Sequence, residues 1–305
     1  MQFSLSTRWN AHRHKCGEEL IDEVLALGFD RAELGYDLRM DLVQGVRDKI
    51  DNGEISCPSV HNFCPVPVGA PRGHPELFSL CSLDERERQS AVRHTKNTIE
   101  FAASINAKAV VVHAGNVRMR NRSRKLMDLA ESEQQFTPKY EKIKIKLLMQ
   151  RDKKGPRHID QLYRSLEELL PMLESSKVAV GIENLPTWEA VPTEIEMEQL
   201  LQKFDSQFIR YWHDMGHGQI RQNLGLINHK FWFERLSPFL AGMHIHDVEF
   251  PAGDHLMPPR GSLNFYDFKS APSCANILVF EPCPGTPPEH VAQGLKTVKS
   301  IWSDS

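Results

Sequence analysis

Short apolar runs, many of them β-branched, alternate along the chain with longer amphipathic stretches, and the alternation repeats eight times. Two of the runs, Ala109–Val112 and Ile277–Phe280, are apolar without interruption, which is typical of strands buried on both faces of a parallel sheet. The pattern predicts strands over Gln2–Ser6, Arg31–Gly35, Ser59–Phe63, Ala109–His113, Val178–Glu183, Ile209–Asp214, Gly242–Asp247 and Ile277–Glu281.

The stretches between these runs carry helix signals. His158–Leu173 has leucines at helical spacing, and Thr193 stands three residues before Glu196, as in a capping box. The predicted helices are Glu18–Leu27, Asp41–Ile50, Asp84–Ser104, His158–Leu173, Thr193–Phe204, His229–Leu236, a short piece near Phe265–Phe268, and Pro288–Trp302. Strand and helix units in this number predict an α/β fold, a (β/α)8 TIM barrel forming a single domain over residues 1–305.

Two segments are longer than ordinary connections. Cys64–Cys81 carries four prolines, and a partly helical insert covers about residues 116–157. Both follow predicted strands, which places them at the C-terminal face of a barrel, as lids or subunit contacts. From Arg118 to Arg157 there are thirteen Lys or Arg against five Asp or Glu. This basic segment is interpreted either as a solvated helical face or as a field that attracts anionic substrates.

Composition narrows the function classes. The formal net charge of −3 disfavours a general nucleic-acid binder, and no apolar stretch approaches the length of a membrane span. Six scattered cysteines without a Cys-x-x-Cys pair fit a reducing compartment, and the first residues lack a secretory signal pattern. We therefore expect a cytoplasmic protein with no membrane partner.

Acidic and imidazole side chains gather where the predicted strands end. Six consecutive strands, from the third to the eighth, end in or just before His61, His113, Glu183, Asp214, His244 and Glu281. Catalytic residues of barrels come from strand ends at one rim, and carboxylates facing one another there need a compensating charge. A divalent cation is the simplest compensation, and mixed oxygen and nitrogen ligands suit Mn, Mg, Co, Fe or Zn.

Four short motifs resemble those of a known superfamily: Glu183-Asn184, Asp214-x-x-His217, His244-Ile245-His246-Asp247 and Glu281-Pro282. They are similar to the strand-end motifs of xylose isomerase-like TIM barrels, which include sugar isomerases, ketose 3-epimerases, hydroxypyruvate isomerases, inosose dehydratases and apurinic-site endonucleases. The resemblance implies one divalent metal (Mn, Mg, Co or Zn) bound by Glu183, Asp214, His244 and Glu281. It also implies that His217 and His255 bind substrate.

His61 and His113 are open to two interpretations. Histidines at these strand ends bind further zinc ions in the endonuclease branch, with Glu183 bridging, whereas in many isomerase-like members they line the sugar pocket. We favour substrate binding for both. Asp254 and His255 are adjacent, whereas the endonuclease motif is Asp-x-His, which disfavours a third metal. His246 is expected to face away from His244.

The resemblance implies a divalent metal-dependent isomerase or epimerase acting on a small polyhydroxy carbonyl compound, a sugar or sugar phosphate. Proton transfer would pass through an enediolate, with Glu183 and Glu281 as the catalytic residues. Three alternatives stay open: an apurinic-site endonuclease-like multi-zinc phosphodiesterase, a sugar-acid or inosose dehydratase, and a non-catalytic sugar-binding barrel. The long insert is compatible with a homo-oligomer.

Overall fold

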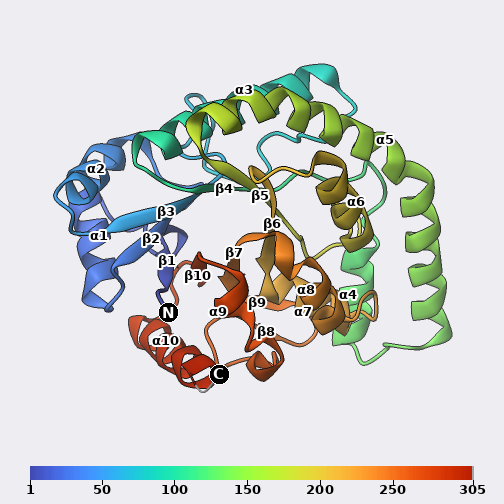
Figure 1. Cartoon of the computed structure of the whole chain (residues 1–305). Coiled ribbons are helices and arrows are strands. Elements are labelled where there is room, and N and C mark those ends of the chain that lie inside the picture. Colours follow the sequence, from blue (N-terminus) through green and yellow to red (C-terminus); the bar gives the residue numbers. More distant parts are fainter. Residues whose placement is uncertain (304–305) are drawn as a thin grey trace.

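Eight parallel strands close into a barrel (Figure 1). The computed structural model describes residues 1–303, and the strand order around the barrel is β1-β10-β7-β6-β5-β4-β3-β2. The barrel strands are β1 (Ser4–Ser6), β2 (Arg31–Leu34), β3 (Ser56–His61), β4 (Ala109–Val112), β5 (Ala179–Glu183), β6 (Ile209–Asp214), β7 (Leu240–Ile245) and β10 (Leu278–Phe280). Each predicted strand overlaps one of them, and the predicted (β/α)8 barrel is confirmed.

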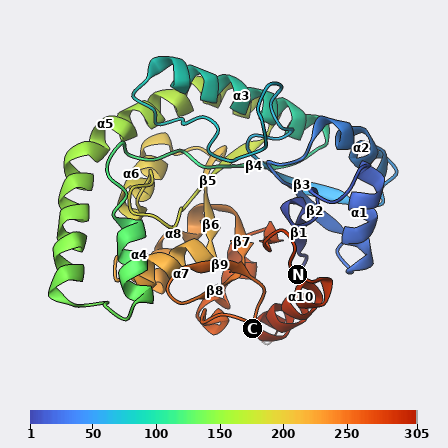
Figure 2. The ribbon, with the colours of Figure 1, turned by 180° about the vertical axis from the view of Figure 1, so that it is seen from behind.

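Helices surround the barrel and pack apolar side chains against its outer face (Figures 1 and 2). They are α1 (Gly17–Ala26), α2 (Val43–Asp51), α3 (Glu85–Ser104), α4 (Ser123–Glu131), α5 (Pro138–Ser176), α6 (Glu194–Phe204), α7 (Met215–Asn223), α8 (His229–Leu236), α9 (Ala271–Cys274) and α10 (Pro288–Ser303). Four short 3-10 turns complete the described chain: η1 (Thr7–Trp9), η2 (Met40–Leu42), η3 (Ser237–Phe239) and η4 (Phe265–Phe268). Within residues 1–303, no helix has both the length and the apolar character needed to cross a bilayer.

Trp212 fills the barrel interior below the strand ends. Its fully buried ring needs space that two glycines on the neighbouring strands provide. A Cβ atom on Gly242 would lie 2.4 Å from Cζ3 of the ring, and one on Gly181 would lie 3.0 Å from Cε3. Because side chains alternate along a strand, Asp214 faces the same way as Trp212. The Trp212 ring, 5.1 Å from the His244 ring, therefore supports the residues at the rim.

A two-stranded antiparallel hairpin, β8 (Asp247–Glu249) and β9 (Gly253–Leu256), follows β7 and was not predicted. The predicted seventh strand extends to Asp247, but β7 ends at Ile245. The Asp247 carboxylate accepts hydrogen bonds from three backbone amides, those of Val248, Gly261 and Leu263, at 2.7–3.0 Å. These bonds fold the segment back, so that His255 returns to the barrel mouth.

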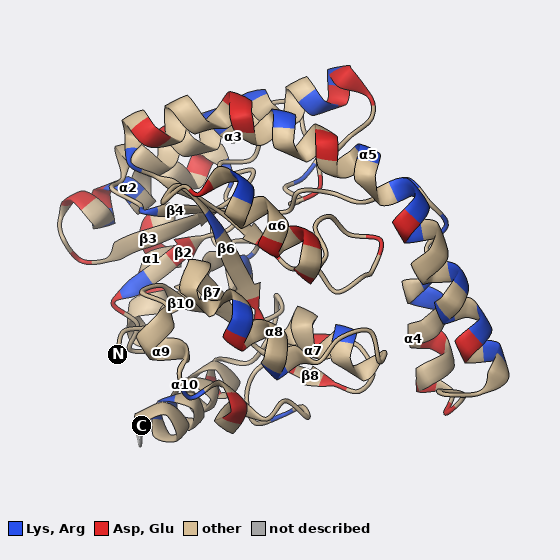
Figure 3. Cartoon of the chain, turned by 45° about the vertical axis from the view of Figure 1, so that its right-hand side comes forward, with Lys and Arg blue, Asp and Glu red and all other residues tan. Residues whose placement is uncertain are grey.

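The basic insert is more regular than predicted. Lys and Arg residues recur along α4 and the first half of α5 (Figure 3), and α5 is a continuous helix of 39 residues that contains the predicted helix His158–Leu173. Thr137 caps its start by accepting a hydrogen bond from Tyr140 N at 3.3 Å. Tyr140 and Leu147 are buried in a second apolar cluster with residues of α4 and α7. The first half of α5 was not predicted as a helix, because its few apolar residues lie among many charged ones and give a weak helical pattern.

Glu196 joins the insert to the barrel. Its Oε2 accepts the Thr193 backbone N–H at 2.8 Å, which confirms the predicted capping box at the start of α6. The same carboxylate accepts two hydrogen bonds from Arg151 of α5, at 2.6 and 2.9 Å. The Arg151 side chain is 3% exposed and that of Glu196 19% exposed, so losing one partner leaves a charge in a largely buried place.

We predict that Glu196→Gln lowers the free energy of unfolding by about 3 kcal/mol, because it preserves the capping-box geometry but leaves Arg151 without a counter-charge. Glu198→Gln on the same helix is the matched control. Its partner Arg235 is 49% exposed, so we expect a loss below about 1 kcal/mol. Urea denaturation of the two variants measures both values. Equal losses would contradict the role assigned to the Arg151–Glu196 pair.

Candidate functional site

The six strand-end residues predicted from sequence converge on one rim of the barrel. His61, Glu183 and Asp214 end β3, β5 and β6, and His244 is the last residue but one of β7. His113 and Glu281 directly follow β4 and β10. Their side chains all point inward, since they share the alternation of the residues that fill the barrel. Above them opens a cavity of about 490 Å³.

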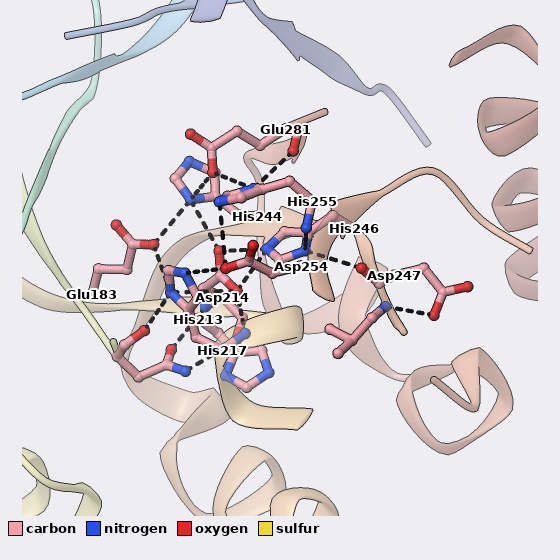
Figure 4. A network of polar contacts seen from close by, with 12 residues as sticks. Glu183, His213, Asp214, His217, His244, His246, Asp247, Asp254, His255 and Glu281 are labelled. Carbon is pink, nitrogen blue, oxygen red and sulfur yellow. Dashed lines mark hydrogen bonds and ion pairs between the residues drawn. The ribbon is translucent and has the colours of Figure 1, made fainter. Parts of the chain in front are cut away.

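His244 is the centre of the first group of polar side chains (Figure 4). Its Nδ1 lies 3.3 Å from Glu183 Oε1, 3.6 Å from Asp214 Oδ2 and 3.4 Å from Glu281 Oε2. All four side chains are at most 5% exposed. Glu183, Asp214 and His244 are spaced closely enough to hold a cation together, and Glu281 forms a second such group with His244 and Glu33. Carboxylate oxygens with an imidazole nitrogen are donors that suit a divalent cation.

Glu33 was missed by the sequence analysis. It lies in β2 and is fully buried, and its Oε1 is 3.0 Å from His244 Nε2 while its Oε2 accepts a hydrogen bond from Ser59 Oγ at 2.8 Å. A carboxylate at Nε2 favours the proton on that nitrogen and leaves Nδ1 free to face the other carboxylates. The available signal was a lone glutamate inside a predicted buried strand.

Without a cation, the histidines carry the compensating charge. Burial alone lowers the pKa of His244, but the carboxylates of Glu281, Glu33 and Glu183 together raise it well above the usual value. Burial likewise lowers the pKa of His217, yet Asp214 and Glu183 raise it to about 9. Burial raises the pKa of Glu183, and the imidazoles of His113 and His244 outweigh it and hold that pKa well below its usual range.

Asp214 is held by the helix that follows it. It is the N-cap of α7, and its Oδ1 accepts the His217 backbone N–H at 2.6 Å. Asn184 accepts the Asp214 backbone N–H at 2.8 Å and donates to the Asp214 carbonyl at 2.9 Å. The Asp214-x-x-His217 spacing is thus that of a capped helix start, which brings the side chains of both residues to the rim.

His61 and His113 form a second group with Glu183. His61 Nε2 lies 3.4 Å and His113 Nε2 3.0 Å from Glu183 Oε2. Both histidines line the cavity. Glu183 therefore presents Oε1 to His244 and Oε2 to this pair, and the three side chains are spaced closely enough to hold a cation of their own.

A third group contains His217, His246 and His255, whose nitrogens lie within 4.8 Å of one another. Asp254 Oδ2 lies 3.9 Å from both His217 Nε2 and His255 Nε2. Asp254 and His255 therefore approach the same group of histidines, although they are adjacent in sequence and do not form an Asp-x-His motif. The expectation that His246 faces away from His244 is wrong. Residues two apart in a strand share a face, and His246 Nε2 lies 3.0 Å from Asp214 Oδ2.

Comparisons with known proteins agree with this architecture. A D-tagatose 3-epimerase-like protein has a TM-score of 0.71 at 17% identity, with 100% of this chain and 98% of that chain covered. The 3-keto-D-glucoside 4-epimerase of E. coli gives 0.70 at 14% identity, over 98% and 99% of the two chains. The IolI protein, solved with a bound zinc atom, gives 0.66 at 12% identity, over 100% and 99%.

Sequence comparison adds a distant relative and a family. An uncharacterised protein of Methanocaldococcus jannaschii is 23% identical over 192 residues, and the match spans 63% of this chain and 61% of that protein. The model of the family described as xylose isomerase-like TIM barrel matches residues 21–301. This covers most of the chain and confirms the resemblance found in the strand-end motifs. The chain belongs to the xylose isomerase-like TIM barrel family.

Proposed function

We propose that this protein is a divalent metal-dependent isomerase or epimerase of a sugar or sugar phosphate. The observation that carries the proposal is the convergence of three buried carboxylates on His244 Nδ1. Two of these carboxylates, Glu183 and Glu281, come from β5 and β10, which are separated in the barrel by β6 and β7. They therefore approach the common point from different directions (Figure 4). The epimerases with the same fold support the same class of substrate.

Glu183, Asp214, His244 and Glu281 are the proposed metal ligands, and Glu33 orients His244. When bound there, a divalent cation (Mn, Mg, Co or Zn) supplies Lewis acidity toward neighbouring carbonyl and hydroxyl oxygens of the substrate. The chemistry of the donor set supports this assignment, as does the zinc atom in the IolI protein. Three buried carboxylates around one imidazole also leave negative charge that a cation offsets.

Glu183 and Glu281 are the proposed catalytic residues. One removes the proton on the carbon beside the carbonyl, and the other returns a proton to the opposite face of that carbon or to its neighbour. His217, His255, His61 and His113 are the proposed ligands of the substrate hydroxyls, because all four line the cavity. Asp214 and His244 hold the metal and take no part in the proton transfer.

The insert shapes this cavity through uncharged side chains. Val117, Met119 and Asn121 line it, whereas none of the lysines and arginines of residues 118–157 does. We therefore propose that any attraction the basic insert exerts on an anionic substrate acts at long range and is screened by salt.

The first test concerns metal binding. We expect Asp214→Ala and His244→Ala each to lose most of the bound metal, measured by mass spectrometry of the digested protein. Because a metal that binds the folded state stabilises it, a chelator should lower the Tm of the parent and change that of the variants much less. Asp152→Ala, an exposed residue of α5, is the control and should keep its metal. Full metal content in both site variants would refute the ligand set.

The second test concerns proton transfer. Glu183→Gln and Glu281→Gln preserve volume and remove the base at one position. We expect each to reduce turnover of a ketose or sugar acid substrate by several orders of magnitude, because general acid–base groups contribute about 10²–10⁴-fold each and here act in sequence. One variant should still exchange deuterium from D2O into recovered substrate, which mass spectrometry detects.

The metal content of each glutamine variant is the control for this test, because both residues are also proposed ligands. If the parent enzyme turns over its substrate with no deuterium in substrate or product, exchange-competent proton transfer by these glutamates is ruled out. A product whose mass shows the loss of one water molecule, with deuterium incorporated from D2O, would instead identify a dehydratase.

A multi-metal phosphodiesterase is the second candidate, favoured by the group of His61, His113 and Glu183 and by the approach of Asp254 to His217 and His255. Metal stoichiometry separates the two functions. One equivalent of tightly bound metal per chain supports the isomerase. Three equivalents, together with cleavage of an oligonucleotide at an abasic site, would support the phosphodiesterase.

A further inference from the structure

Arg8 places a guanidinium at the edge of the carboxylate-rich cavity. It belongs to η1, which follows β1, and β1 pairs with β2 on one side and β10 on the other. Arg8 therefore stands between Tyr36, just beyond β2, and Glu281, just beyond β10. Among residues 1–303, it is the one lysine or arginine that lines this cavity.

Tyr36 fixes the Arg8 side chain. Arg8 Nε donates a hydrogen bond to the Tyr36 hydroxyl at 2.6 Å. The Tyr36 ring in turn packs edge-on against His61, with ring centroids 5.1 Å apart. The guanidinium is thus held in one orientation before any ligand binds, which reduces the entropy lost on binding.

Among residues 1–303, the two Nη atoms of Arg8 have no hydrogen-bond partner, although the guanidinium carbon lies 6.0 Å from the centre of the Tyr36 ring. Within the described part of the chain no carboxylate oxygen approaches Arg8 within 4.0 Å, and Nη1 is buried without a hydrogen bond. An unpaired donor of a charged group in a buried position costs about 1–3 kcal/mol or more. The structure maintains this cost beside a cavity that is also lined by Glu281, which points to a ligand group that satisfies the donors.

We infer that Arg8 binds a negatively charged group of the substrate, a carboxylate or a phosphate, and so selects sugar acids or sugar phosphates over neutral sugars. The inference rests on the proposed function, because the anionic group at Arg8 would belong to the same substrate whose carbons react beside Glu281. Four glutamates line the cavity, namely Glu76, Glu183, Glu189 and Glu281. These carboxylates disfavour an anion beside them, and Arg8 adds to the proposed metal a positive charge with which an anionic group can pair directly. A planar guanidinium with two free Nη atoms suits two-point binding of either oxyanion.

The test compares three six-carbon compounds that share the hydroxyl pattern of C2–C5: D-glucitol, which is neutral, D-gluconate, which has a carboxylate at C1, and D-glucitol 6-phosphate, which has a phosphate at C6. Calorimetric titration of the metal-loaded parent should show at least one anionic polyol binding about 10- to 100-fold tighter than glucitol, as expected for a charge-assisted hydrogen-bonded pair. Arg8→Gln should abolish this preference and leave glucitol affinity within about twofold. Whichever anion carries the preference identifies the group as carboxylate or phosphate.

Two further variants separate charge from geometry. Arg8→Lys retains the charge without the planar fork and should recover only part of the preference. Arg86→Gln removes a charge from the exposed surface of α3 and should change nothing. Metal content should stay at the parental level in all variants, because Arg8 is outside the proposed ligand set.

The inference is overturned if the parent binds neither anion more tightly than glucitol, or if Arg8→Gln weakens glucitol as much as the anions. Deuterium exchange distinguishes failure of the Arg8 inference from failure of the proposed isomerase function. If the parent and Arg8→Gln exchange a neutral ketose and a ketose phosphate equally well, the protein is an isomerase without the Arg8 selectivity. Anion binding that depends on Arg8, with no exchange from any carbonyl compound tested, supports Arg8 and rejects the isomerase.

Discussion

Carboxylates that share one buried space repel one another, and Glu183, Asp214 and Glu281 are at most 4% exposed around a single imidazole. At an effective dielectric constant near 20, two unit charges roughly 5 Å apart repel by about 3 kcal/mol. Positive charge in the centre turns this repulsion into attraction. In the metal-free chain the raised pKa values of His217 and His244 supply it, and a bound cation can supply it instead. Folding of the barrel mouth is therefore coupled to the charge placed there.

The parallel barrel imposes this crowding through simple geometry. Every second residue of a strand points inward, so each strand delivers one inward side chain at its C-terminal end. Trp212, accommodated by Gly181 and Gly242, occupies the space below. The polar side chains are thereby confined to the rim, where the cavity of about 490 Å³ gives a small molecule access to them.

The barrel and its six strand-end residues were predictable because each depends on local sequence, either strand periodicity or the last residue of a strand. The rest depends on contacts between distant segments. Glu33 contacts His244, which is 211 positions away in the sequence. A single glutamate in a strand carries no sequence signal that identifies this partner. The β8–β9 hairpin is held by the Asp247 carboxylate and not by an apolar pattern. Arg8 was overlooked for the same reason, because its significance lies in Tyr36 and Glu281 on neighbouring strands.

Glu183 belongs to the sites of both candidate functions, the isomerase and the phosphodiesterase. Its Oε1 faces His244 and His217, while its Oε2 faces His61 and His113. With one cation at His244, the histidines at Oε2 remain available to substrate hydroxyls, and Glu183 can act as a base. His61, His113 and Glu183 Oε2 would hold a second cation, which would lower the basicity of Glu183. The two proposed activities would thus use the same side chains with different numbers of bound cations, and the Nη donors of Arg8 would suit an anionic ligand in either case.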